Sequence, residues 1–245
     1  MRILLAFALL AACGKGKPTN QDQPSGSAGS AGSAGSAVAS GSAAVPANGQ
    51  APDVALPPST GTPPNKAKAL DEATLKKLAA LTYPGWTLKP MQLSDKSMIV
   101  RHTTASPPKL VVTVQARPCS DTVVCLPLEL EKWKADQKFN DTLLGALKDA
   151  KDTVKEIGTA DFNGQPMISS FVLGQAFGLD AAGNSPGTYK YAYGLYYNDG
   201  TNLIQVVAGY GDLPLKTKEM MQQAIPREDL EKTARAFMDA YTHAW

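Results

Sequence analysis

The sequence predicts an α+β domain in which helices pack against an antiparallel sheet, preceded by a long low-complexity segment. Strand-like runs separated by turn residues fill most of the second half of the chain. Two pairs of these runs are joined by Asn-Gly or Asp-Gly, the dipeptides that favour a tight β-hairpin because a type I′ turn needs positive φ. The chain ends in a helical stretch with one apolar face, which needs a sheet to cover.

Composition divides the 245 residues into three parts. Residues 1–12 read as a signal peptide, residues 13–66 as a disordered tether, and residues 67–245 as a single α+β globular domain. The formal net charge is +2, and no basic patch is interleaved with aromatic residues. We therefore expect no nucleic acid among the partners.

The first residues indicate export and a lipid anchor. Arg2 precedes the short apolar run Ile3–Leu10, the layout of a secretory signal, and a spanning helix would need ~20 apolar residues. Leu10-Ala11-Ala12-Cys13 resembles the lipobox of bacterial lipoproteins. The resemblance implies cleavage before Cys13, lipidation of its thiol and acylation of its amino group. The alternative is an ordinary secretory signal that happens to end at a cysteine.

This interpretation places the protein in the bacterial cell envelope, held to a membrane by its lipid. Gly14 follows the cysteine, whereas an aspartate would resemble an inner-membrane retention signal. We therefore expect the outer membrane, with the domain facing the periplasm or exposed on the surface.

The tether combines Gly-Ser-Ala repeats from Gly26 to Ala37 with a proline-rich segment after them. Such a composition cannot bury enough apolar surface to offset the entropy of ordering the chain. A flexible coil of about fifty residues spans ~40 Å. The predicted role is reach, and a spacer of no selected length is the alternative.

The domain is expected to contain helices and strands in a fixed order. They are a helix over 71–81, strands over 86–93, 97–104 and 109–116, a long helical stretch over 128–150, strands over 154–161, 167–173, 188–197 and 202–210, and a last helix after Pro226.

The second predicted hairpin has a tyrosine-rich face that must pack against something or bind something. Counting outward from a turn centred on residues 199–200 places Tyr189, Tyr191 and Tyr193 on one face, with Tyr193 beside Val206. These three tyrosines are a candidate ligand face for a sugar, a peptide or a lipid. The alternative is a half-buried face under the last helix.

The last helix carries the apolar stripe that would cover this face. Its members recur at helical spacing and are Leu230, Ala234, Phe237, Met238, Tyr241 and Trp245. We expect Phe237 to be nearly fully buried, since two exposed apolar surfaces of this size are unusual on a soluble monomer.

The three cysteines divide into a lipid site and a pair. With Cys13 lipidated, Cys119 and Cys125 remain, and an oxidising compartment favours a disulfide between them. A redox centre is the alternative, but such centres usually have Cys-x-x-Cys spacing, and five residues intervene here.

No recognised catalytic, metal-binding or cofactor motif is present. The two histidines are His102, in a predicted strand, and His243, which suits a helix C-terminus as a cation. The polar loop over 178–187 lacks the ligand spacing of a calcium loop. We therefore predict no catalytic residues, no metal and no cofactor, and expect the protein not to be an enzyme.

The order of elements also resembles a known family. Phe162-Asn163-Gly164-Gln165-Pro166, the tyrosine-rich hairpin and the closing helix with Ala236-Phe237-Met238 resemble the Mog1/PsbP-like α/β/α sandwiches, which include many small bacterial lipoproteins. The resemblance covers residues 70–245 and implies that fold and a non-enzymatic accessory role. Cystatin-like and NTF2-like sheets are competing topologies.

Three functions are compatible with these observations. The first is a lipid-anchored envelope protein whose domain binds another envelope protein or a cell-wall component. The second is a carrier with a pocket for an apolar small molecule between sheet and helix. The third is an uncharacterised hydrolase that uses His102 and a nearby carboxylate.

Replacing Cys13 with serine tests the anchor. Because the acyl chains are attached to this residue in the lipoprotein interpretation, Cys13→Ser should move the protein from the membrane fraction to the soluble envelope fraction. Fractionation of intact cells measures this, and unchanged membrane association would contradict the lipoprotein interpretation.

Overall fold

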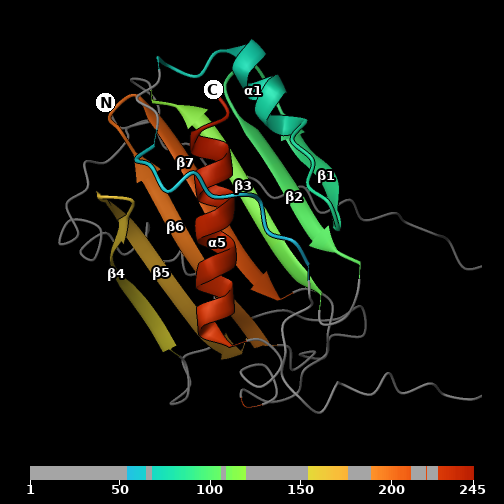
Figure 1. The fold of residues 1–245 in the computed structure, drawn as a ribbon, viewed down its shortest axis with the longest axis vertical. Coiled ribbons are helices and arrows are strands. Elements are labelled where there is room, and N and C mark those ends of the chain that lie inside the picture. Colours follow the sequence, from blue (N-terminus) through green and yellow to red (C-terminus); the bar gives the residue numbers. More distant parts are fainter. Residues whose placement is uncertain are drawn as a thin grey trace, which may run out of the picture. The chain divides into compact units, whose positions relative to one another are not determined.

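The computed structural model describes residues 54–64, 68–105, 109–119, 154–175, 189–210, 219 and 226–245. The elements within them are α1 (Glu72–Ala79), β1 (Trp86–Leu93), β2 (Met98–Thr104), β3 (Leu110–Pro118), β4 (Val154–Phe162), β5 (Gln165–Gln175), β6 (Tyr189–Asn198), β7 (Asn202–Tyr210) and α5 (Arg227–Thr242). The strands form one sheet in the order β1-β2-β3-β7-β6-β5-β4 (Figure 1). All neighbouring pairs are antiparallel, so the predicted α+β class is confirmed.

The hairpin between β4 and β5 forms as its sequence predicts. Asn163 and Gly164 have φ values of 50° and 83°, as a type I′ turn requires. Phe162 pairs with Gln165 directly across this turn. The register then continues without a shift to Val154 opposite Leu173.

The hairpin between β6 and β7 has the predicted face but a different register. Tyr193 pairs with Ala208, whereas Val206 pairs with Leu195, so the predicted neighbour of Tyr193 is wrong by two positions. The cause lies in the turn, where the Asp199 carboxylate accepts hydrogen bonds from the backbone N–H groups of residues 201 and 202. This widens the connection, and a shift of two positions keeps every side chain on its predicted face.

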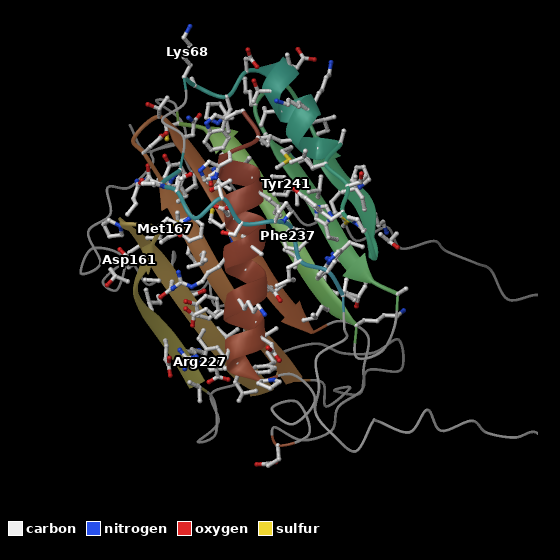
Figure 2. All side chains as sticks on the ribbon, in the orientation of Figure 1. Lys68, Asp161, Met167, Arg227, Phe237 and Tyr241 are labelled. Carbon is white, nitrogen blue, oxygen red and sulfur yellow. The ribbon has the colours of Figure 1, made fainter. Side chains whose placement is uncertain are left out.

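The last helix packs on the sheet as predicted. α5 lies across β3, β7 and β6 on one face (Figure 1), and Phe237 is fully buried beneath it. The Phe237 ring centroid lies 4.9 Å from the rings of Trp86 and His102 and 5.3 Å from that of Tyr83. The buried part of the predicted stripe comprises Leu230, Ala234, Phe237, Met238 and Tyr241, and Figure 2 labels Phe237 and Tyr241 there.

The first helix covers the other end of the same sheet. α1 packs on β1 and β2 and buries Leu75 and Leu78 completely. Asp71 caps its N-terminus, with its carboxylate accepting the N–H of Thr74 at 2.7 Å.

Residues 54–64, here named the strap, lie against the domain although the sequence assigns them to the tether. Val54 and Leu56 pack against the hydrophobic core, and the Trp86 indole donates a hydrogen bond to the Ala55 carbonyl at 3.0 Å. In Figure 1 the strap crosses α5 as the light-blue segment. Residues that the sequence assigns to the tether therefore make specific contacts with the domain.

A buried carboxylate fixes the strap to the helix. Asp239 of α5 is 1% exposed and accepts hydrogen bonds from the backbone N–H and hydroxyl of Thr60 and from the Asn163 side chain. His243 adds a second connection, since its Nδ1 lies 2.8 Å from the Asp239 carbonyl and its Nε2 lies 2.9 Å from the Pro63 carbonyl. Strap, hairpin turn and helix end thus meet at Asp239.

Both faces of the central strands are buried. On the face away from α5, Ile168 and Val172 of β5 and Tyr196 of β6 are buried. The Tyr196 hydroxyl lies 3.0 Å from that of Ser170, which satisfies both groups inside the protein.

Several predicted features lie outside the described residues. They are the signal peptide, Cys13, the Gly-Ser-Ala repeats, Cys125, the helix over 128–150 and the loop over 178–187. Cys119 is disulfide-bonded, and its pairing with Cys125 stays a prediction. No helix among the described residues is long and apolar enough to cross a membrane.

Truncating Phe237 measures how much the helix contributes. Because the ring is fully buried among three other rings, Phe237→Ala should lower the free energy of unfolding by ~3–5 kcal/mol. Denaturant titration measures this. The control on the same helix is Lys232→Ala, an exposed position where a change within ~0.5 kcal/mol is expected. A near-neutral Phe237→Ala would mean that the helix is not docked.

Candidate functional site

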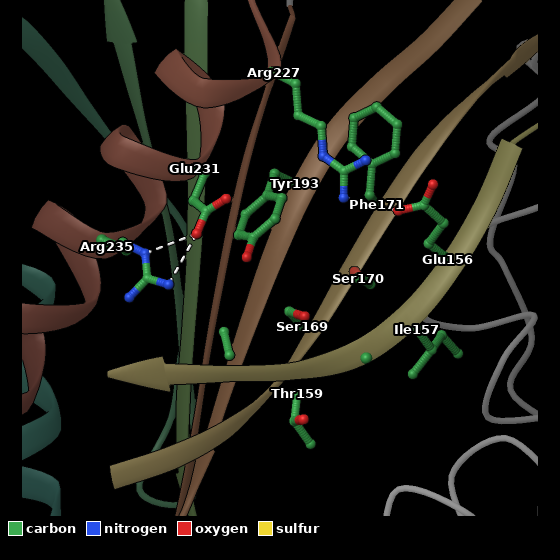
Figure 3. Close-up of a pocket in the computed structure, with 12 residues that line it drawn as sticks. Glu156, Ile157, Thr159, Ser169, Ser170, Phe171, Tyr193, Arg227, Glu231 and Arg235 are labelled. Atoms are coloured by element: carbon green, nitrogen blue, oxygen red, sulfur yellow. Dashed lines mark hydrogen bonds and ion pairs between the residues drawn. The ribbon is translucent and has the colours of Figure 1, made fainter. Parts of the chain in front are cut away.

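A surface cleft of about 530 Å³ opens beside α5, over the strands that the helix leaves uncovered. Its lining comes from α5 and from the three neighbouring strands β4, β5 and β6 (Figure 3). The residues are Glu156, Ile157, Gly158, Thr159 and Ala160 of β4, Ser169, Ser170 and Phe171 of β5, Tyr193 of β6, and Arg227, Glu231 and Arg235 of α5. We name this hollow the cleft.

Strand register explains why the cleft has this floor. Gly158 of β4 pairs with Ser169, and Glu156 pairs with Phe171, which in turn pairs with Tyr193 of β6. Side chains at such positions stand on the same face of the sheet. A Cβ atom at Gly158 would make an ordinary contact of 3.6 Å with the Ser169 hydroxyl, so a small side chain fits at this point of the floor.

Two ion pairs frame the cleft. Arg227 bonds to Glu156 at 2.7 Å and thereby connects α5 to the edge of the sheet, while its guanidinium lies 4.1 Å above the Phe171 ring. Arg235 pairs with Glu231 at 2.8 Å and also donates to the Asp161 carbonyl.

These four charged side chains keep substantial exposure, with side-chain values from 34% to 49%. Ion pairs exposed to this degree contribute ~0–1 kcal/mol each to stability. Their net contribution is small enough for a charged ligand to replace one partner with its own group.

The floor offers neutral hydrogen-bonding groups. Burial, and next the charge of Glu231, raise the pKa of Tyr193, so its hydroxyl keeps its proton. That hydroxyl hydrogen-bonds to Ser169. Ser169 thus has a phenol as its neighbour and not a base, so this contact does not activate it as a nucleophile.

A second hollow of about 560 Å³ adjoins the cleft and uses the strap as a wall. It is bounded by strap residues, by the β4–β5 turn and by α5, and it shares Glu231 and Arg235 with the cleft. The lining is Leu56, Pro57, Ser59, Phe162, Asn163, Glu228, Glu231, Lys232, Arg235 and Ala236. The Arg235–Glu231 ion pair therefore lies between the two hollows.

The candidate ligand face of tyrosines is mostly interior. Tyr191 and Tyr193 are 2% and 4% exposed, as the packing alternative requires, and burial raises the pKa of Tyr191 to about 12. Tyr193 alone of these two lines the cleft. The side chain of Tyr189 lies outside the described residues.

The histidine of the hydrolase hypothesis is sequestered in the core. His102 is fully buried; its Nε2 lies 2.8 Å from the Tyr241 hydroxyl, and its ring lies 5.5 Å from that of Tyr83. Burial lowers the pKa of His102 to about 4, so the ring is neutral near pH 7. No carboxylate contacts it within the described part of the chain, where its Nδ1 has no hydrogen-bond partner.

The sequence did not identify the charged residues of the cleft as candidate site residues. Arg227, Glu231 and Arg235 recur every four residues and alternate in sign on α5, a pattern usual for an exposed helix face. Glu156 could not be connected to them, since its ion pair joins residues 71 positions apart. In the residues described here, no group of three or more His, Cys, Asp or Glu side chains could hold a metal ion.

Comparison with known proteins adds no relative. No protein-family model matches the chain, and no curated protein and no solved structure matches it.

Protonation of His102 makes stability depend on pH in a defined direction. The unfolded histidine has a pKa near 6.5 and the folded one about 4, so the unfolded state binds the proton first as the pH falls. The free energy of unfolding keeps the full contribution of the neutral histidine above about pH 6.5. It falls progressively towards pH 4, by up to about 3 kcal/mol. Urea titrations between pH 4 and 7 measure this.

The control compares His102→Gln with the parent chain over the same pH range. The variant loses some stability at pH 7 but lacks the titrating ring, so its stability should fall less between pH 6.5 and 4. Parallel curves for the two proteins would contradict the buried, neutral histidine.

Proposed function

We propose that this chain is a lipid-anchored cell-envelope protein whose domain binds a polar partner in the cleft without chemical turnover. The anchor rests on Arg2, the apolar run that follows it and the lipobox-like Leu10-Ala11-Ala12-Cys13. The partner is another envelope protein or a cell-wall component. The domain faces the periplasm or the cell surface at the end of its tether.

The observation that carries the binding proposal is the pair of exposed ion pairs on the rim of the cleft. Arg227 and Arg235 present guanidinium groups, while Glu156 and Glu231 present carboxylates within the same hollow. A ligand with both anionic and cationic groups, such as a peptide segment, can pair with each of them in turn. Neutral donors and acceptors on the floor at Tyr193 and Ser169 suit its polar backbone.

Binding without turnover is favoured over the hydrolase. The Ser169 hydroxyl has a phenolic partner, and His102 lies in the aromatic core under α5 with Tyr241 as its hydrogen-bond partner. General-base catalysis needs a base within hydrogen-bond reach of the proton it removes. Among the described residues the cleft lining offers carboxylates already engaged by arginine.

The carrier of an apolar small molecule is the less supported alternative. Its pocket would lie between the sheet and the last helix, where Phe237, Met238 and Tyr241 are fully buried and pack against the sheet. The hollows that do open beside the helix have charged rims.

We also keep the Mog1/PsbP-like α/β/α sandwich as the proposed fold family. The antiparallel sheet with α5 on one face fits it. Burial of Ile168, Val172 and Tyr196 on the opposite face is what a sheet covered on both sides requires.

Site-specific photo-crosslinking in intact cells tests the binding proposal. A photoreactive side chain at Lys232, which lines the second hollow next to the cleft, should capture one discrete partner. Arg235→Ala should reduce the yield about tenfold, the effect of ~1.4 kcal/mol for one charge-assisted contact. Thermal unfolding of the variant establishes that it still folds.

The matched control position is Lys76 on α1, which is exposed at the opposite end of the sheet. Equal capture at Lys76 and Lys232, or unchanged capture after Arg235→Ala, would contradict binding at this site.

A further inference from the structure

The two edges of the sheet are built differently. β1 is protected by Pro90, which cannot donate a backbone hydrogen bond, and by a register shift between Pro90 and Gln92. Prolines and bulges of this kind prevent an edge strand from pairing with another chain. Among the described strands, β4 is the outermost on the other side, and it contains neither a proline nor a register shift.

The tight turn determines which backbone groups of β4 point outward. In a two-residue hairpin, the pair that closes the turn is hydrogen-bonded, and hydrogen-bonded pairs then alternate along the strands. Phe162 closes this turn with Gln165. The even-numbered residues of β4 therefore bond to β5, and the N–H and C=O groups of Lys155, Ile157, Thr159 and Asp161 point away from it. The bond from Arg235 to the Asp161 carbonyl agrees with this assignment.

The sequence of β4 is complementary to itself when two copies run antiparallel. The strand has nine residues with Gly158 at its centre. A two-fold axis at Gly158 places Lys155 opposite Asp161 on both sides of the axis, and Ile157 opposite Thr159. All four belong to the set whose backbone groups point outward, so the hydrogen-bonded ladder and the charge pairing share one register.

We propose that two copies of this chain associate through β4, edge to edge and antiparallel about Gly158, to form one continuous sheet. Such an interface is isologous, because each residue meets the same partner on both sides. Opposite charges directly across strands stabilise the register, and any shift by two positions loses them. The inference does not depend on the lipid anchor or on the ligand of the cleft.

Pairing through β4 also brings the two clefts together. Glu156, Gly158 and Ala160 line the cleft from β4 and stand on the face of the sheet that α5 occupies. The cleft of one copy therefore adjoins that of the other across the axis. A partner bound in one cleft lies directly beside the second site.

Disulfide trapping of the purified full chain tests this register. Gly158 is opposite its own copy in a non-hydrogen-bonded pair, where Cα atoms lie ~4.5 Å apart, within the ~4.4–6.8 Å that a disulfide spans. A Cβ atom at Gly158 would make an ordinary contact of 3.6 Å with Ser169, so Gly158→Cys fits the folded chain. Mild oxidation should convert most of this variant to a disulfide-linked dimer, and a reductant should return it to the monomer.

The control is Lys155→Cys on the same strand. The two copies of this position lie six residues apart along the paired strands, ~20 Å, so no dimer should form. Equal trapping of the two variants, or no trapping of a folded Gly158→Cys chain, overturns the proposal. So does a parent chain that sediments as a monomer at the concentrations used for trapping.

Charge reversal then tests the pairing itself. In the Gly158→Cys background, Lys155→Asp places like charges opposite each other and should lower the dimer yield several-fold. Adding Asp161→Lys to that variant restores opposite charges and should restore the yield. An unchanged yield of disulfide-linked dimer in both charge variants overturns the proposed register.

Discussion

The structure depends on one docking event, the burial of the apolar stripe of α5 on the sheet. Phe237 lies at its centre and contacts rings from β1, β2 and the segment before them. Without the helix, the tyrosines of β6 and the aliphatic residues of β7 would face water. The cleft exists because the helix is narrower than the sheet, so β4 and β5 extend beyond it. Among the described residues, the long charged side chains of Arg227 and Glu156 connect the helix to this part of the sheet.

Asp239 converts this packing into a specific arrangement. A buried carboxylate is costly unless its oxygens receive hydrogen bonds, and here the donors come from Thr60 of the strap and Asn163 of the hairpin turn. The contact of His243 with Pro63 holds the same segment at the end of the helix. Two segments far apart in sequence therefore position the wall of the second hollow and the turn that follows the edge strand β4.

Local patterns predicted most of the fold. The Asn163-Gly164 turn fixed the β4–β5 register because its geometry depends only on neighbouring residues. The β6–β7 register shifted by two positions because Asp199 accepts backbone hydrogen bonds that composition does not reveal. The sequence did not predict the strap or the cleft, because the hydrogen-bond partners of Thr60 and of Glu156 lie far away in the sequence. Interactions of high sequence separation need the three-dimensional arrangement to be recognised.

The position of α5 after all the described strands has a consequence for the order in which the domain folds. Thr60 and Asp239 are 179 residues apart. The rings of Trp86 in β1 and His102 in β2 pack against Phe237 of α5. Because α5 follows every described strand in the sequence, a chain that emerges from the ribosome N-terminus first cannot close this core until residues 227–242 have emerged. Until then the strap lacks Asp239, its hydrogen-bond partner on α5, and the sheet stays uncovered on that face.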